Sequence, residues 1–414
     1  MGTTIIKPVA KKKLLFVAGL GWLFDAMDVG IIAFIGAALM KDWNLLPQQV
    51  GWIGSVNSLG MMVGALLAGI FADRVGRKPI LLATVLLFSL ASGFSALTTT
   101  FAAFLTLRFF IGLGLGGELP VSSTLVSESI PEKHSGRTIV LLDTFWVAGW
   151  ILAAVISYFV IPKFGWQSAL LICALPALYT VYLRREIPDS PSFRQPRKKK
   201  PSIKENMKAI WSSKYAKSTI MLWLLWFCVF FAYYGMFLWL PSVMVLKGFA
   251  LVKSFGYVLI MTLAQLPGLL SAAWLIDKVG RKFVIITYLI MAAICGYFFG
   301  NADSLAMLMI CGILLSFFNV GAIGTIWAYT PEQYESKIRS TGTGMASAIG
   351  RIGGILGPLL LGYLVAAEVT FGIIFAIFCG FIVIGALSVL LLGKETRPDA
   401  LDMDEGETSL DHAL

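Results

Sequence analysis

The stretch Gly69–Lys78 reads GIFADRVGRK, and it ends one long apolar segment and begins another. A second copy, AWLIDKVGRK, occupies Ala273–Lys282, about half of the 414-residue chain later. An aspartate, a basic run and a helix-breaking glycine between two hydrophobic segments predict a short loop that stays in water and bonds the ends of neighbouring helices. Because the loop recurs at matching positions, the sequence predicts two related halves.

The composition places the chain in a lipid bilayer. Hydrophobic residues make up 58% and charged residues only 14% of it, and the mean hydropathy is +0.83. A soluble domain has about 25% charged residues. The net charge of +10 would suggest a nucleic-acid partner for a soluble protein, but in a membrane protein it reflects basic cytoplasmic loops, so no nucleic-acid partner is expected. Repeated halves in a bilayer are typical of transporters.

Apolar runs long enough to cross a hydrocarbon core of about 30 Å as helices recur along the whole chain. We therefore predict an all-α membrane protein with 12 transmembrane helices in two pseudo-symmetric six-helix bundles. The runs lie near 14–40, 49–72, 79–98, 101–128, 138–161 and 166–183, and then near 218–244, 253–276, 283–300, 304–330, 340–365 and 370–393.

Charge and composition between the runs predict orientation and domains. Most lysine and arginine residues fall on the side of the two termini, so both termini are predicted to be cytoplasmic. Ser202 and Glu205 form a capping-box pattern that predicts a short interfacial helix in the linker. The predicted domains are an N-terminal bundle at 1–184, a cytoplasmic linker at 185–217, a C-terminal bundle at 218–393 and a disordered acidic tail at 394–414.

Acidic residues inside the first bundle are candidates for proton coupling. Asp25 and Asp28 lie three residues apart on one face of the first run. Asp28 lies roughly 21 Å from the cytoplasmic start of its run and Arg108 roughly 8 Å from the outer start of its own, so both reach one depth. A pair that protonation of the aspartate would release is therefore possible. Glu118 and Asp143 could bind a proton or an organic cation, or could simply bond helix ends.

The second bundle supplies a different set of side chains. Trp226 and Tyr233 are seven residues apart and share a helix face, which suits a flat ring. Arg351 lies about 15 Å into its run, near the midplane, and its own half offers no obvious acid. An aromatic cavity with a guanidinium suits an aromatic carboxylate. The substrate-binding candidates are Arg351, Tyr233, Tyr234, Trp226, Trp150, Gln265 and Asn319.

The repeated loops and the charged helix ends beside them predict a cytoplasmic gate made of ion pairs. Its candidate residues are Gly69, Asp73, Arg74, Gly76, Arg77, Glu128, Arg137, Asp277, Gly280, Arg281, Glu332 and Arg339.

These residues and motifs resemble the major facilitator superfamily over nearly the whole chain. The specific signature is G-x-x-x-D-R-x-G-R-K at 69–78, with a degenerate repeat at 273–282. GWLFDAMDVG, RFFIGLGLGGELPVSSTLVSE, YYGMFLWLPSVM and TPEQY together are similar to bacterial niacin permeases of the metabolite/proton symporter type.

Two other branches of the superfamily resemble parts of the chain. Similarity to proton-coupled sugar porters implies that Asp28 and Arg108 correspond to the coupling pair of those porters, and it places Trp150 near a sugar-binding position. The seventh helix lacks the glutamine pair of those porters, which argues against a sugar. AYYG at 232–235 and RIGGILGP at 351–358 are similar to organic anion transporters. Cation-transporting relatives have an acid at the place of Arg351, so the resemblance implies an anionic substrate.

The sequence therefore predicts a cell-membrane importer of nicotinate or a similar small aromatic carboxylate, driven by proton symport with alternating access. The alternatives are a transporter of another organic solute, such as nicotinamide, another monocarboxylate or a sugar, and a membrane receptor that binds without transport. We expect no enzymatic activity, because no nucleophile with a base, metal cluster or nucleotide loop is recognisable. We likewise expect no cofactor or metal, and a monomer.

Overall fold

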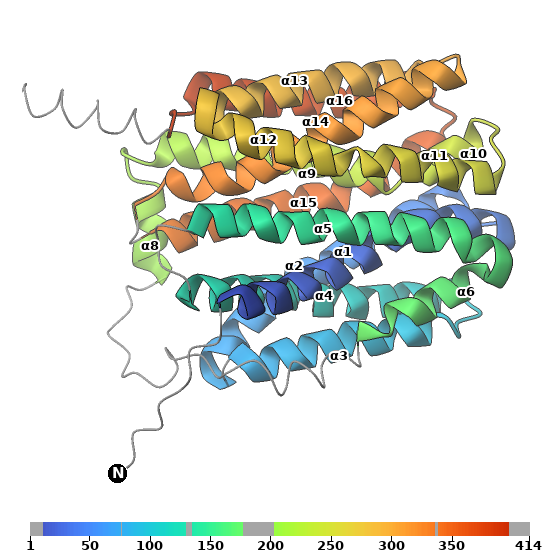
Figure 1. Cartoon of the computed structure of the whole chain (residues 1–414), viewed down its shortest axis with the longest axis horizontal. Helices are drawn as coiled ribbons and strands as arrows, with labels where there is room; N and C mark the ends of the chain where they lie inside the picture. The colour runs from blue at the N-terminus through green and yellow to red at the C-terminus, as the bar shows by residue number, and fades with distance from the viewer. Residues whose placement is uncertain (1–10, 76, 130–134, 177–202, 336–337, 397–414) are drawn as a thin grey trace, which may run out of the picture. The chain divides into compact units, whose positions relative to one another are not determined.

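The computed structural model describes residues 11–75, 77–129, 135–176, 203–335 and 338–396, and all regular structure in this part of the chain is helical (Figure 1). The first half contains α1 (Lys11–Asp42), α2 (Pro47–Val75), α3 (Arg77–Ser95), α4 (Phe101–Ser129), α5 (Ser135–Phe159) and α6 (Ile161–Cys173). The second half contains α8 (Ile203–Ile210), α9 (Ala216–Phe237), α10 (Leu240–Leu246), α11 (Leu251–Leu263), α12 (Gln265–Val279), α13 (Arg281–Gly300), α14 (Leu305–Glu332), α15 (Arg339–Ala366) and α16 (Phe371–Leu392).

Ten segments of the described chain are long and apolar enough to cross a membrane. They lie within α1, α2, α3, α4 and α9, in the continuous stretch 251–279, and in α13, α14, α15 and α16. Residues 143–159 of α5 form a shorter apolar helix. The predicted all-α membrane fold is confirmed.

Two of the predicted runs are interrupted by a proline. The run near 218–244 stops being α9 at Phe237 and resumes as α10, because Pro241 cannot donate to the Phe237 carbonyl. The run near 253–276 is split between α11 and α12, where Pro267 removes the bond to Leu263. Hydropathy does not register these breaks because proline interrupts hydrogen bonding without making the segment polar.

Gly165 divides α6 in a similar way. Its φ of 79° and ψ of 165° are not helical, so the turn at 161–164 is separate from the helix that starts at Trp166. Glycine adopts a positive φ without the steric cost that a Cβ would add. The predicted start of this run at 166 coincides with that break.

Close helix packing in the first half depends on glycines that face backbone carbonyls. A Cβ on Gly112 of α4 would collide with the Asn57 carbonyl of α2, and a Cβ on Gly116 would collide with that of Met61. Gly149 of α5 faces the Leu23 carbonyl of α1 in the same manner. Without side chains at these points the backbones touch, which is how membrane helices gain packing energy.

The second half repeats both contacts. Gly353 and Gly357 of α15 face the carbonyls of Phe227 and Phe231 in α9, and Gly268 of α12 faces the Phe317 carbonyl of α14. The α9–α15 pair thus corresponds to α1–α5, and the α12–α14 pair to α2–α4. The two halves therefore share not only the repeated loop but also the same pairs of packed helices.

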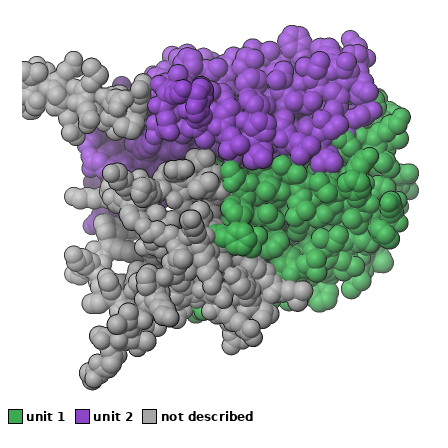
Figure 2. Space-filling model, viewed as in Figure 1, with its two compact units in different colours: residues 1–44, 52–198, 245–256 green, residues 45–51, 199–244, 257–414 purple. Residues whose placement is uncertain are grey.

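The chain forms two compact units, which are coloured separately in Figure 2. Unit 1 comprises residues 1–44, 52–198 and 245–256, and unit 2 comprises residues 45–51, 199–244 and 257–414.

Candidate functional site

A buried ion pair lies in unit 1, between α1, α3 and α4. Arg108 of α4 donates from Nη1 to Oδ2 of Asp28 in α1 at 3.5 Å. The Ser92 hydroxyl of α3 donates to Oδ1 of the same carboxylate at 2.9 Å. None of the three residues is exposed. A buried charge needs such partners, and the structure brings together the two residues that the sequence analysis paired by depth.

Aromatic rings pack around the guanidinium of this pair. Its Cζ lies 4.9 Å from the ring centre of Phe104, one turn earlier on α4. Phe104 in turn packs edge-on against Trp43 and Trp166. Among the described residues, Nε and Nη2 of Arg108 have no hydrogen-bond partner. The guanidinium therefore depends on Asp28 for its countercharge, and a proton on Asp28 would remove that countercharge.

The other three candidate acids of unit 1 are also buried, each being at most 8% exposed: Asp25, Glu118 and Asp143. The Glu118 carboxyl of α4 interacts with that of Asp25 in α1. It also lies where a Cβ on Gly21 would be, so it sits against α1 about one turn before Asp25. Two carboxyl groups in contact favour holding one proton between them. Asp143 lies on α5, and its Oδ2 has no hydrogen-bond partner among the described residues.

In unit 2, Arg351 of α15 lies among aromatic side chains of α9. Its Nη1 donates to the Tyr234 hydroxyl at 3.3 Å, and its Cζ is 5.9 Å from the ring centre of Phe230. Gly350 and Gly354 flank the arginine and let Trp226 and Tyr234 pack directly on α15. Arg351 is 9% exposed. A guanidinium beside ring faces can bind a carboxylate with two parallel hydrogen bonds while the rings contact an aromatic body.

The remaining aromatic candidates of α9 are Tyr233 and Trp226, which pack on the rings next to this arginine. The ring of Tyr233 lies edge-on to that of Tyr234, with centres 5.3 Å apart. Trp226 donates from Nε1 to the Thr330 hydroxyl of α14 at 2.9 Å, and its ring lies edge-on to Trp327 at 4.6 Å. These contacts orient the indole. Trp226, Phe230, Tyr233 and Tyr234 thus form an aromatic cluster of α9.

Three predicted substrate-binding residues lie outside this cluster. Gln265 of α12 and Asn319 of α14 are each 1% exposed, and neither amide has a hydrogen-bond partner among the described residues. Trp150 belongs to unit 1, where its ring packs on Gly30 of α1.

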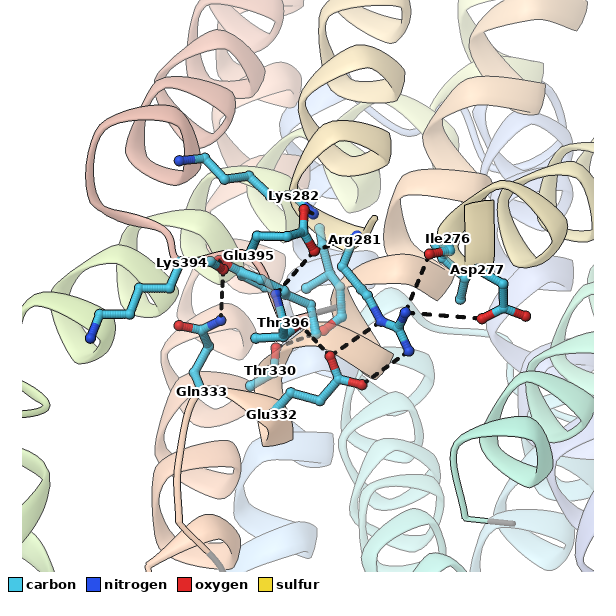
Figure 3. Close-up of polar contacts among 12 residues, drawn as sticks. Ile276, Asp277, Arg281, Lys282, Thr330, Glu332, Gln333, Lys394, Glu395 and Thr396 are labelled. Atoms are coloured by element: carbon cyan, nitrogen blue, oxygen red, sulfur yellow. Dashed lines mark hydrogen bonds and ion pairs between the residues drawn. The ribbon is translucent and has the colours of Figure 1, made fainter. Parts of the chain in front are cut away.

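A polar network joins the start of α13 to the ends of α14 and α16 in unit 2 (Figure 3). Arg281 contacts Glu332 from Nε at 3.3 Å and from Nη2 at 3.4 Å, and contacts Asp277 from Nη1 at 4.0 Å. Glu395 accepts from the backbone N–H groups of Arg281 at 2.9 Å and Lys282 at 3.1 Å. An acid at this position satisfies otherwise unpaired amides and complements the helix dipole.

The chain after α16, residues 393–396, binds this network at several further points. Tyr329 donates to the Lys394 carbonyl at 2.7 Å, and the Gln333 amide donates to the same oxygen at 3.2 Å. Lys282 donates to the Gly393 carbonyl at 2.9 Å, and the Thr396 hydroxyl donates to Glu332. The sequence predicts a disordered tail from 394, but residues 394–396 are held here because they complete helix ends.

The predicted gate residues are only partly described. The start of α13 brings together four of them, Asp277, Gly280, Arg281 and Glu332. Arg339 instead donates to the Tyr334 carbonyl at 3.4 Å. Beside them, Lys214 donates to Glu335, and this hydrogen bond raises the pKa of the lysine. In the first copy Gly69 lies in α2, and Gly76 lies outside the described residues. The side chains that also lie outside the described part are those of Asp73, Arg74, Arg77, Glu128 and Arg137.

Comparison with known proteins identifies the family. The model of the Major Facilitator Superfamily matches residues 18–271 and 255–409. The chain belongs to the major facilitator superfamily. The chain is 45% identical to the niacin transporter NiaP of Acinetobacter baylyi (strain ATCC 33305 / BD413 / ADP1) over 94% of this chain and 95% of that protein. It is 59% identical to a candidate niacin/nicotinamide transporter, NiaP of Bacillus subtilis (strain 168), over 96% and 99%.

A solved transporter structure shares the fold. The crystal structure of a D-xylose-proton symporter superposes with a TM-score of 0.78 at 20% identity, covering 93% of this chain and 98% of the symporter. The helical repeat described above is therefore the superfamily fold, and at this identity the similarity concerns the fold alone.

Several residues that contact these candidate site residues were not predicted from the sequence. Ser92, Phe230, Thr330 and Glu395 each contact a predicted residue from another part of the chain or another turn. Serine, threonine and phenylalanine are common in apolar helices, so only the fold distinguishes these positions. The position of Glu395 does give an indication in the sequence, because an acid just after the last span can cap the start of a helix.

Proposed function

We propose that the protein is a secondary active transporter that imports nicotinate, the anion of niacin, by proton symport across the cell membrane. Superfamily membership supports a multi-pass membrane transporter, and the two NiaP relatives support a niacin substrate. The observation that carries the anionic form is Arg351 beside Tyr234 and Phe230. Its guanidinium binds the carboxylate and the rings of α9 contact the pyridine ring.

Asp28 is the coupling carboxylate in this proposal. When it is ionised, it holds Arg108 and Ser92 together between α1, α4 and α3. A proton on Asp28 weakens the link to α4, and loss of the proton restores it. Because the proton alters helix contacts, its movement can be tied to a conformational change. Asp25, Glu118 and Asp143 are further places where this unit can hold the proton.

The bundles at 1–184 and 218–393 act as the two halves that rock to give alternating access. The repeated loops form the cytoplasmic gate, with Arg281, Asp277 and Glu332 in the second copy. In the first copy of the loop sequence, the gate candidates are Asp73, Arg74 and Arg77. Both termini and the linker 185–217 are cytoplasmic, and one chain is sufficient for transport.

Uptake into proteoliposomes tests the proposal. The purified protein is reconstituted, and radiolabelled nicotinate is supplied with an inward-directed proton gradient. We expect accumulation above the external concentration, and its collapse when a protonophore removes the gradient. Binding of nicotinate without uptake would instead identify a receptor. Equal uptake of nicotinamide would contradict the role of Arg351, because the amide carries no charge for the guanidinium to bind.

A further inference from the structure

Asn319 is a buried amide with nothing in the described structure to bind. It is 1% exposed on α14, and neither Oδ1 nor Nδ2 has a hydrogen-bond partner among the described residues. Burying an amide without partners is costly in a protein core and in lipid. A membrane helix that keeps such a group therefore has a reason to present donors and an acceptor at this point.

The periodicity of α14, about 3.6 residues per turn, shows which way Asn319 faces. Phe317 and Gly321 lie four residues apart on the side of α14 that packs on Gly268 and Tyr288. Asn319 is about 200° around the helix from both, so it faces away from α12 and α13. Thr330 lies eleven residues later and within about 20° of Asn319. Since Thr330 accepts from Trp226, Asn319 lies on the side of α14 that faces the aromatic cluster of α9.

The depth of Asn319 also matches the arginine site. α9 and α14 cross the membrane in opposite directions, because two spans, α11–α12 and α13, lie between them in the chain. Starting from the Trp226–Thr330 contact, Asn319 lies roughly 16 Å along α14 and Tyr234 roughly 12 Å along α9. Asn319 is therefore within one helical turn of the level of Tyr234, whose hydroxyl binds Arg351.

We propose that Asn319 donates a hydrogen bond to the ring nitrogen of the substrate and so selects a pyridine carboxylate over a carbocyclic aromatic acid. This inference rests on the proposed function, in which Arg351 binds the carboxylate of the same molecule. A neutral pyridine nitrogen accepts one hydrogen bond in the ring plane, and a primary amide supplies it. Benzoate has a C–H group at that position, so its binding leaves the desolvated amide without a partner.

The test compares nicotinate with benzoate in equilibrium binding to the purified full-length protein. We expect the native protein to bind benzoate roughly 10- to 100-fold more weakly than nicotinate. Asn319→Leu keeps a branched side chain without polar atoms, and we expect the two affinities to become similar, with benzoate binding kept. Asn319→Ala provides the same comparison if the larger side chain does not fit. The variants should melt no lower than the native protein, since an unpaired buried amide is removed.

Thr325→Val is the matched control on the same helix. Thr325 is also buried, but its hydroxyl donates to the Gly321 carbonyl at 2.9 Å and so needs no ligand. We expect this variant to keep the native preference for nicotinate.

Two results would overturn the inference while leaving nicotinate transport intact. One is a native protein that binds nicotinate and benzoate equally. The other is a folded Asn319→Leu protein that still prefers nicotinate as strongly as the native one, most clearly if Gln265→Leu loses the preference instead. If the native protein binds neither acid, the proposed function itself is wrong.

Discussion

Among the described residues, two arginines of the spanning helices are buried, Arg108 in unit 1 and Arg351 in unit 2, and they are held differently. Arg108 bonds a carboxylate at 3.5 Å and is 0% exposed, whereas Arg351 donates to a tyrosine hydroxyl at 3.3 Å and is 9% exposed. A carboxylate partner changes charge with one proton, so the first contact can respond to a proton gradient. A neutral hydroxyl can give up its place to an incoming anion. The proposed mechanism uses this difference, with energy coupling in one half and substrate recognition in the other.

The largest expected effect comes from removing the arginine of unit 2. Arg351→Ala should weaken nicotinate binding by about 2 to 5 kcal/mol, because the carboxylate loses a charged, hydrogen-bonded partner in a desolvated site. Arg351→Lys should lose less, since it keeps the charge but not the two-pronged geometry. Titration of all three proteins at one pH measures these differences.

Nicotinamide provides the control for that titration. It should bind the native protein poorly and lose little further affinity with Arg351→Ala, because it has no charge to lose. Thermal melting of each variant separates lost binding from misfolding. A folded alanine variant with native affinity for nicotinate would show that Arg351 is a purely structural cation. The proposed contrast between a coupling arginine and a substrate-binding arginine would then be wrong.

The next effect concerns the pair of unit 1. Asp28→Asn should abolish uphill nicotinate uptake driven by a pH gradient while some solute exchange remains, because the amide cannot cycle between charged and neutral forms. Proteoliposomes with and without internal nicotinate distinguish the two activities. Accumulation at the native level would move the coupling role to Glu118 or Asp143.

Stability must be controlled in that experiment, because Asp28→Asn leaves Arg108 buried without its countercharge. Removing one member of a buried pair destabilises a protein by about 3 to 5 kcal/mol. The double variant Asp28→Asn with Arg108→Gln removes both charges and should melt higher than the single variant. It should still lack gradient-driven uptake.

A smaller effect is expected from the hydroxyl that holds Arg351. Tyr234→Phe should weaken nicotinate binding by about 1 kcal/mol, because the guanidinium loses the acceptor that orients it. The matched control is Tyr288→Phe, which removes a hydroxyl contact to Ser271 at 2.9 Å elsewhere in unit 2. The control should leave nicotinate affinity unchanged. Equal losses in both variants would indicate a general packing effect.

The smallest effect should come from the cytoplasmic network. Glu332→Gln removes a partner of Arg281, but the carboxylate side chain is 33% exposed, so the pair contributes at most about 1 kcal/mol. We expect slower uptake, by no more than about fivefold, with unchanged nicotinate affinity. A loss of affinity would show that this network is not separate from the binding residues.

The sequence was informative where polar groups are rare. Asp28, Arg108 and Arg351 can be singled out because a charge in an apolar run is costly, and residue counting alone places Asp28 and Arg108 at one depth. The spans were predicted for the same reason, since lipid requires long apolar helices. The repeat of AWLIDKVGRK likewise located the network around Arg281.

Partners of these residues could not be predicted because they come from other helices. Ser92 and Thr330 are ordinary helix residues until the fold places them beside Asp28 and Trp226. The breaks at Pro241 and Pro267 were missed because hydropathy averages over the interruption. Composition alone indicates a disordered tail from residue 394, although Glu395 caps the start of α13.

That cap has a practical meaning for anyone who shortens or tags the chain. A terminus placed after Leu392 would remove the acceptors of Tyr329, Gln333 and Lys282 together with the carboxylate at the start of α13. A terminus or fusion joint placed after Thr396 keeps all of them. We therefore expect the four residues beyond the last span to stabilise a shortened protein in detergent, and any truncated or tagged version should retain them.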